Sequence, residues 1–173
     1  MSFLKSIENN SKQFNDPFTH WELNKPLTEG QIKEIINADI DNPVEHNLNY
    51  DGTRAIDGGE GIYREGHSDG GKALKFRCFI TKENYKDFPN LTNFIEELQK
   101  KETYEKVSSL IGKDLSNAYI RVEVICDRKG FWLKPHCDIK EKLMSCLLFV
   151  NEFNESEDLG TDFYDKDLNK VKT

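Results

Sequence analysis

The sequence predicts an α+β fold in which helices come first and antiparallel strands follow, with the helices packed on one side of a β-sandwich or jelly roll. Before residue 112, three segments carry apolar side chains at helical spacing. From Ala118 onward the period changes to two, which is typical of strands that bury one face. The 173 residues suit a single domain. We expect residues 1–117 to form a helical, loop-rich wrapping and residues 118–173 to form the first part of the jelly-roll core.

The N-terminal part is expected to begin with a polar, loosely held segment over residues 1–19. A first helix should then start at Thr28, because Thr28 and Gln31 have the spacing of a capping box. The buried side of this helix would carry four isoleucines: Ile32, Ile35, Ile36 and Ile40. Two more helices are predicted after Pro89, and Gly112 is a natural C-terminal stop for the second of them. Their apolar faces would consist of Leu91, Phe94, Ile95 and Leu98, and of Tyr104, Val107, Leu110 and Ile111.

Four strands follow from the alternation of apolar and polar residues. Residues 73–81 should form one, with one face made of Leu74, Phe76, Cys78 and Ile80. Residues 118–126 should form another, with Ile120, Val122, Val124 and Cys126 on one side and Tyr119, Arg121, Glu123 and Ile125 on the other. The nearly continuous apolar run 143–150 predicts a strand that is buried on both faces. Residues 162–164 are expected to form a further strand, entered through Gly160.

Composition narrows the class of partner. The formal charge of −7 and the pI of about 5.2 argue against binding to nucleic acid or to anionic membrane surfaces. No apolar run approaches the roughly 20 residues that span a bilayer, and the first ten residues lack a signal-peptide pattern. We therefore expect a cytoplasmic protein whose four cysteines are reduced thiols.

The most informative motif is His136-Cys137-Asp138. On a strand, residues i and i+2 point to the same face, so His136 and Asp138 would project together. Pro135 keeps the preceding residue extended and stiffens the approach. One imidazole nitrogen and one carboxylate oxygen are two of the three ligands of a 2-His-1-carboxylate site for Fe(II). Zinc fits less well, because cysteines at metal-binding spacing are missing from the sequence.

The flanks of this motif, residues 131–138, 142–151 and 159–164, resemble the 2-oxoglutarate/iron(II)-dependent oxygenases, and most closely their prolyl-hydroxylase-like branch. The resemblance implies a double-stranded β-helix, which is a cupin-like jelly roll. It implies that His136 and Asp138 bind Fe(2+), that 2-oxoglutarate is the cosubstrate, and that a small-molecule or peptidyl substrate is hydroxylated. The family's second histidine and its oxoglutarate-binding arginine lie in later strands, and no histidine follows His136. We therefore expect a C-terminally incomplete jelly roll, either a partial chain or one completed by a partner chain.

Other interpretations of these residues remain open. His136 could be a hydrogen-bonded core histidine and Asp138 a turn residue, in a jelly-roll module that binds a partner without catalysis. A cupin-like protein with a different metal is a third hypothesis. Tyr119 and Arg121 are candidates for binding the oxoglutarate carboxylate if their strand face lines the barrel, whereas Arg121 would simply pair with Glu123 if that face is solvated.

Several weaker signals precede the motif in the sequence. Residues 66–73 nearly match a phosphate-binding loop, but they lack both the final hydroxyl residue and a following helix. Residues 51–71 are better interpreted as a loop, with a possible role as a lid over the site. The other three histidines, His20, His46 and His67, lie in polar contexts and are expected to be exposed.

Overall fold

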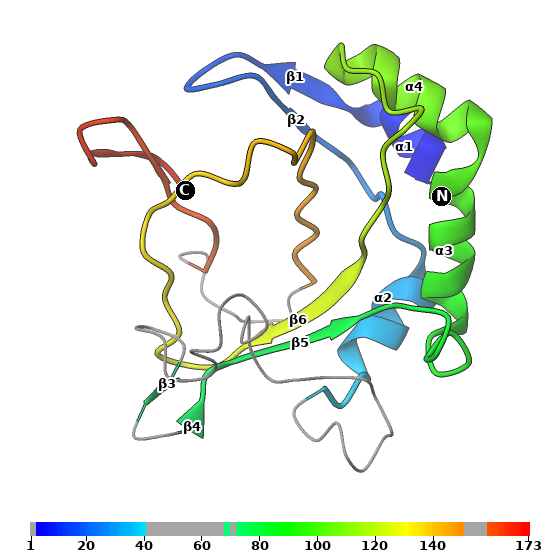
Figure 1. Cartoon of the computed structure of the whole chain (residues 1–173), viewed down its shortest axis with the longest axis horizontal. Helices are drawn as coiled ribbons and strands as arrows, with labels where there is room; N and C mark the ends of the chain where they lie inside the picture. The colour runs from blue at the N-terminus through cyan, green and yellow to red at the C-terminus, as the bar shows by residue number, and fades with distance from the viewer. Residues whose placement is uncertain (1–2, 41–67, 70–71, 151–158) are drawn as a thin grey trace.

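The computed structural model describes residues 3–40, 68–69, 72–150 and 159–173 (Figure 1). Within them the chain is α+β and forms two-stranded antiparallel sheets, without a closed barrel. The helices gather on one side of the molecule, and the C-terminal hairpin lies on the other. The helices are α1 (Phe3–Asn10), α2 (Glu29–Ile36), α3 (Pro89–Gln99) and α4 (Lys101–Ile111). The strands are β1 (Lys12–Phe14), β2 (His20–Glu22), β3 (Ser68–Asp69), β4 (Lys72–Ala73), β5 (Lys75–Phe79), β6 (Glu123–Asp127), β7 (Phe163–Tyr164) and β8 (Lys170–Lys172).

The predicted capping box at the start of α2 is confirmed. The Thr28 backbone N–H donates to Gln31 Oε1 at 2.8 Å, and the Gln31 backbone N–H donates to Thr28 Oγ1 at 3.3 Å. These two bonds satisfy backbone donors that a helix N-terminus otherwise leaves without a partner. The helix therefore starts where the sequence predicts.

The second and third predicted helices are also confirmed. Pro89 occupies the first turn of α3, where its missing N–H costs nothing. Gly112 closes α4 in the left-handed conformation, with φ of +65°, which a glycine adopts without strain.

A carboxylate from α2 caps the start of α3. The N-cap residue Phe88 has no side-chain oxygen to offer, and Glu34 takes its place. Glu34 accepts from the backbone N–H of Asn90 at 2.8 Å, from Asn90 Nδ2 at 2.9 Å and from the backbone N–H of Leu91 at 2.7 Å. A negative charge at a helix N-terminus is favourable, so this contact fixes α2 against α3.

Strands β5 and β6 lie side by side and form the central antiparallel pair (Figure 1). Their register places Cys78 opposite Val124 and Phe79 opposite Glu123. Cys78 and Val124 are buried against residues of α3 and its approach, including Phe88 and Leu91. The predicted apolar faces are therefore confirmed for most of their residues, namely Phe76, Cys78, Ile80, Val122, Val124 and Cys126. Ile120 is the exception, because it lies before β6 and is 43% exposed. The opposite face carries charged side chains together with Phe79 and Ile125.

The N-terminal segment is more ordered than predicted. Phe3 and Ile7 of α1 are buried in a second cluster with Phe94 and Val107, and the rings of Phe3 and Phe94 meet edge-on at 5.5 Å. The prediction of a loosely held segment over residues 1–19 was therefore wrong for α1. Phe3 and Ile7, four residues apart, lie on one face of the helix, and such a short apolar face is easily overlooked among polar neighbours.

The two terminal hairpins contact one another. The rings of Phe18, in the β1–β2 loop, and Phe163, in β7, lie 4.8 Å apart. Lys172 Nζ lies 2.9 Å from His20 Nε2 and 3.7 Å from a carboxylate oxygen of Glu22. The C-terminal hairpin, which includes the predicted strand at 162–164, is thus held against the N-terminal one.

Residues 143–150 depart most from the prediction. They form no strand, and Leu147 and Phe149 are 56% and 62% exposed. Leu148 and Val150, between and beyond them, pack against the second cluster. Side chains therefore alternate between exposed and packed over residues 147–150, and only one face of the segment lies against the core. A continuous apolar run predicts double burial only if a second layer covers it, and no such layer occurs among the described residues.

Candidate metal-binding site

The His136-Cys137-Asp138 motif lies in an extended segment that leaves β6 through a turn (Figure 1). The turn is closed by a hydrogen bond from the Phe131 backbone N–H to the Arg128 carbonyl at 3.0 Å, and Gly130 has φ of +95° within it. The expected strand over the motif is not formed, and His136, Cys137 and Asp138 are all exposed. The motif is therefore accessible to a metal ion from solvent.

His136 is oriented by its own backbone. Its Nδ1 lies 2.9 Å from the carbonyl oxygen of Lys134. A carbonyl can only accept, so Nδ1 is the donor, and in the neutral imidazole Nε2 then keeps its lone pair. A metal-bound histidine has the same arrangement, with one ring nitrogen donating to a carbonyl and the other free for the ion.

Asp138 is ionised, and its carboxylate already contacts two neighbouring side chains. Lys142 Nζ lies 2.9 Å from Asp138 Oδ2, and Ser145 Oγ donates to the same oxygen at 3.2 Å. The hydrogen bond from Lys142 is the largest of the effects that hold the pKa of Asp138 below its ordinary value. The carboxylate is thus available in its metal-binding form, but a cation has to compete with Lys142 for Oδ2.

The motif offers two candidate ligands, and the described residues bring no third one to it. No further His, Cys, Asp or Glu gathers with another two into a group of metal-binding size in this part of the chain. His20 is engaged elsewhere, stacked on Phe14 at 5.2 Å and in contact with Lys172. His46 and His67 lie outside the described residues, as does most of the predicted lid at 51–71.

The candidates for the oxoglutarate carboxylate are only partly brought together. Tyr119 is 89% exposed and lies before the start of β6. Arg121 Nε lies 2.6 Å from Glu123 Oε1, so the pairing expected for a solvated face is present. Arg77 on β5 contacts the same carboxylate. Sequence reasoning missed Arg77, although its place between Phe76 and Cys78 put it on the polar face of the strand.

Two further contacts of the motif were also missed. Lys142 and Ser145 follow Asp138 at four and seven residues, and both contact its carboxylate. The i, i+4 spacing of Asp138 and Lys142 was the available signal, but that rule applies to helices, and these residues lie in an irregular turn.

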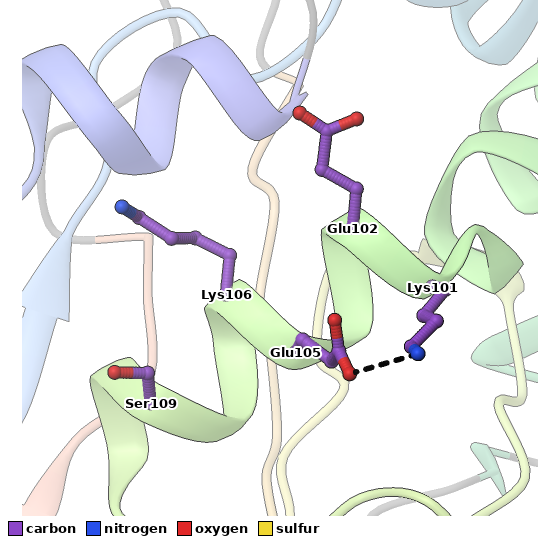
Figure 2. A pocket seen from close by; sticks show the side chains of 5 residues that line it. All are labelled: Lys101, Glu102, Glu105, Lys106 and Ser109. Carbon is purple, nitrogen blue, oxygen red and sulfur yellow. Dashed lines mark ion pairs between the residues drawn. The ribbon is translucent and has the colours of Figure 1, made fainter.

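A surface hollow on α4 offers no comparable chemistry. It is lined by Lys101, Glu102, Glu105, Lys106 and Ser109, all from one exposed helix face (Figure 2). Lys101 and Glu105 form an i, i+4 ion pair at 3.7 Å, and Lys106 lies 3.7 Å from Glu8. These are ordinary solvated pairs, so the hollow does not define a site.

Two further findings concern membrane-spanning helices and similarity to known proteins. Among the described residues, each helix is too short or too polar to cross a bilayer. No family model, no curated protein and no solved structure matches this chain.

Proposed function

We propose that this chain is an Fe(II)- and 2-oxoglutarate-dependent dioxygenase of the prolyl-hydroxylase-like kind, built on a double-stranded β-helix. The observation that carries the proposal is the state of the motif. His136 presents Nε2 with its lone pair because Nδ1 donates to the Lys134 carbonyl, and Asp138 two residues later is ionised. Imidazole nitrogen and carboxylate oxygen are the donor set of a 2-His-1-carboxylate iron site.

The residues of the motif have defined parts in this function. His136 and Asp138 would hold the ion, and the Lys134 carbonyl would keep the imidazole in the metal-binding tautomer. Lys142 would leave Asp138 Oδ2 when the ion binds, while Ser145 could keep its hydrogen bond to the carboxylate. The ion held by these residues would supply the chemistry of the family, in which oxoglutarate and O₂ give succinate and CO₂ while a C–H bond of the substrate is hydroxylated.

The distribution of side chains over the two faces of β5 and β6 supports the proposed fold. The apolar face of β5 and β6 packs on the helices, and the opposite face carries polar side chains. A jelly roll with helices outside one sheet requires this division, since its inner face lines the ligand site.

The experiment is a turnover assay with the metals compared side by side. Chain purified without metal is incubated with oxoglutarate, O₂ and Fe²⁺, Mn²⁺ or Zn²⁺, and succinate is measured. Because the chain offers only two of the three protein ligands in its described part, the proposal expects weak succinate formation, above background with Fe²⁺ only, and its loss in His136→Ala. Succinate formation that is equal in wild type and His136→Ala would refute the assignment of the motif.

A second candidate function is a non-catalytic binding module. It is favoured by the contacts of Asp138, which is held by Lys142 and Ser145 as a turn residue would be. Under this alternative, Asp138→Ala lowers stability, and metal content stays at background in both proteins. Metal binding by wild type that is lost in Asp138→Ala would exclude it.

A further inference from the structure

The two terminal hairpins meet around the imidazole of His20. One face of the N-terminal hairpin carries Lys12, Phe14, His20 and Glu22, because paired and alternate residues of antiparallel strands lie on the same side. Lys172 of β8 reaches this face. Its Nζ lies 2.9 Å from His20 Nε2, 3.7 Å from Glu22 Oε1 and 5.4 Å from the centre of the Phe14 ring. One ammonium of the C-terminal hairpin therefore contacts three side chains of the N-terminal hairpin.

Both ring nitrogens of His20 have partners that fix its protonation state. Nδ1 lies 2.8 Å from the Phe18 carbonyl oxygen, which can only accept, so Nδ1 donates. Nε2 faces the Lys172 ammonium, which can only donate, so Nε2 accepts with its lone pair. Lysine holds its proton far more strongly than histidine does, so the proton between them stays on Lys172. The contact therefore requires a neutral imidazole with its proton on Nδ1.

Protonation of His20 removes this contact. An imidazolium carries an N–H donor on each nitrogen, so two positively charged donors would face each other across 2.9 Å. The charged groups around His20 in the described part of the chain are Lys172 from β8, Glu22 from β2, and Lys12, which lies opposite Glu22 in β1. Two lysines and one glutamate sum to +1, and an imidazolium raises the sum to +2. Glu22 alone cannot neutralise three cations.

The two hairpins can separate without disturbing either sheet. β1–β2 and β7–β8 are separate two-stranded sheets in the described residues, so no ladder of backbone hydrogen bonds joins them. A second contact between them, the ring pair of Phe18 and Phe163 at 4.8 Å, lies next to the first. Phe18 supplies the carbonyl that accepts from His20, and Phe163 is paired with Lys172 in the register of β7 and β8. The distance between these two rings therefore reports on the contact of His20 with Lys172.

We propose that His20 and Lys172 form a pH-sensitive latch, which joins the two terminal hairpins at neutral pH and releases them on acidification. Histidine is the side chain whose charge ordinarily changes between pH 5 and 8. The latched arrangement binds one proton fewer than the released one, so a fall in pH favours release. The inference goes beyond the proposed function, because it involves neither the His136-Cys137-Asp138 motif nor a metal ion.

The test follows the contact between the hairpins by NMR on the isotope-labelled full-length chain, at about pH 7.5 and about pH 5. The readout is the nuclear Overhauser effect between the rings of Phe18 and Phe163. Its intensity is divided by that of the same effect between Phe3 and Phe94, whose rings meet in the helical core. This ratio separates release of the hairpin from loss of the whole fold.

Three variants separate the latch from other effects of acid. His20→Gln keeps an oxygen that accepts from Lys172 but has no group that becomes charged. Lys172→Met removes the ammonium that an imidazolium would repel. Lys166→Met is the matched control, because it removes the same charge from the turn between β7 and β8.

We expect the intensity ratio to fall by about half or more at the lower pH in wild type and in Lys166→Met, since a hydrogen bond to a charged group is lost. In His20→Gln and in Lys172→Met the ratio should be the same at both pH values. A wild-type ratio that does not change with pH, or the same fall in His20→Gln or Lys172→Met, would overturn the proposal. An equal loss of the Phe3–Phe94 signal would assign the change to unfolding and would overturn it as well.

Discussion

Lys142 competes with any cation for Asp138, and replacing it by methionine should therefore strengthen metal binding. The Lys142 ammonium lies 2.9 Å from Asp138 Oδ2, and the two side chains are 35% and 47% exposed. An ion pair of this exposure is worth up to about 1 kcal/mol, which a metal ion must overcome. An ammonium held about 5 Å from a divalent ion adds a repulsion of roughly 1.5 kcal/mol at the dielectric constant of water, before salt screening.

Together these effects predict that Lys142→Met lowers the free energy of metal binding by about 1–2 kcal/mol, which is roughly a 5- to 30-fold tighter dissociation constant. The assay is an anaerobic titration with Fe²⁺ or Mn²⁺ against a competing indicator at neutral pH. Lys140→Met is the matched control, because it removes the same charge two residues away without an ion pair to Asp138. Equal affinities for Lys142→Met and Lys140→Met, or weaker binding by Lys142→Met, would refute the reasoning.

Three further predictions concern the scaffold. Glu34→Gln should lower the free energy of unfolding by about 1–2 kcal/mol in urea denaturation, since the charged cap of α3 is lost; an unchanged value would show that the helix start needs no such cap. Gly112→Ala should cost about 1 kcal/mol in the same assay because its φ is +65° while the space around it is open, and a stabilising effect would contradict this. Burial raises the pKa of Cys78 from 9.0 to about 11, so its alkylation in the folded chain should stay slow until the pH approaches 11. The Cys78 thiol loses its proton at lower pH in the unfolded state than in the folded state. Its contribution to the free energy of unfolding should therefore be constant below pH 9 and fall between pH 9 and 11. If a Cys78→Ala variant loses stability with the same slope over this range, Cys78 is not the group responsible.

Local signals predicted α2, α3 and α4 well, whereas α1 was missed. The capping box at Thr28 and the glycine stop at Gly112 act within a few residues, so their outcome does not depend on the rest of the chain. The alternation in β5 and β6 was also sufficient, because one face of each strand meets the helical core. The prediction of a buried strand over residues 143–150 failed for the opposite reason. Their burial depends on a covering layer that the segment itself does not specify, and Leu147 and Phe149 remain exposed without it.

The surroundings of the candidate ligands could not be predicted from the sequence. His136 and Asp138 are only two residues apart in the sequence, so their proximity follows from the chain itself. Asp138 contacts Lys142 through a turn without regular structure. Glu123 contacts Arg77 and Arg121 because of the register of two strands that lie more than 40 residues apart in the sequence. Such pairings follow from the packing of the whole domain, and a short pattern does not encode them.

An anaerobic Fe²⁺ titration of wild type and His136→Ala decides whether His136 and Asp138 form a metal site. We expect one equivalent of Fe²⁺ per wild-type chain and loss of that binding in His136→Ala, with the circular dichroism of the two proteins unchanged because the imidazole is exposed. Absence of Fe²⁺ binding in wild type, or the same affinity and stoichiometry in both proteins, would contradict it.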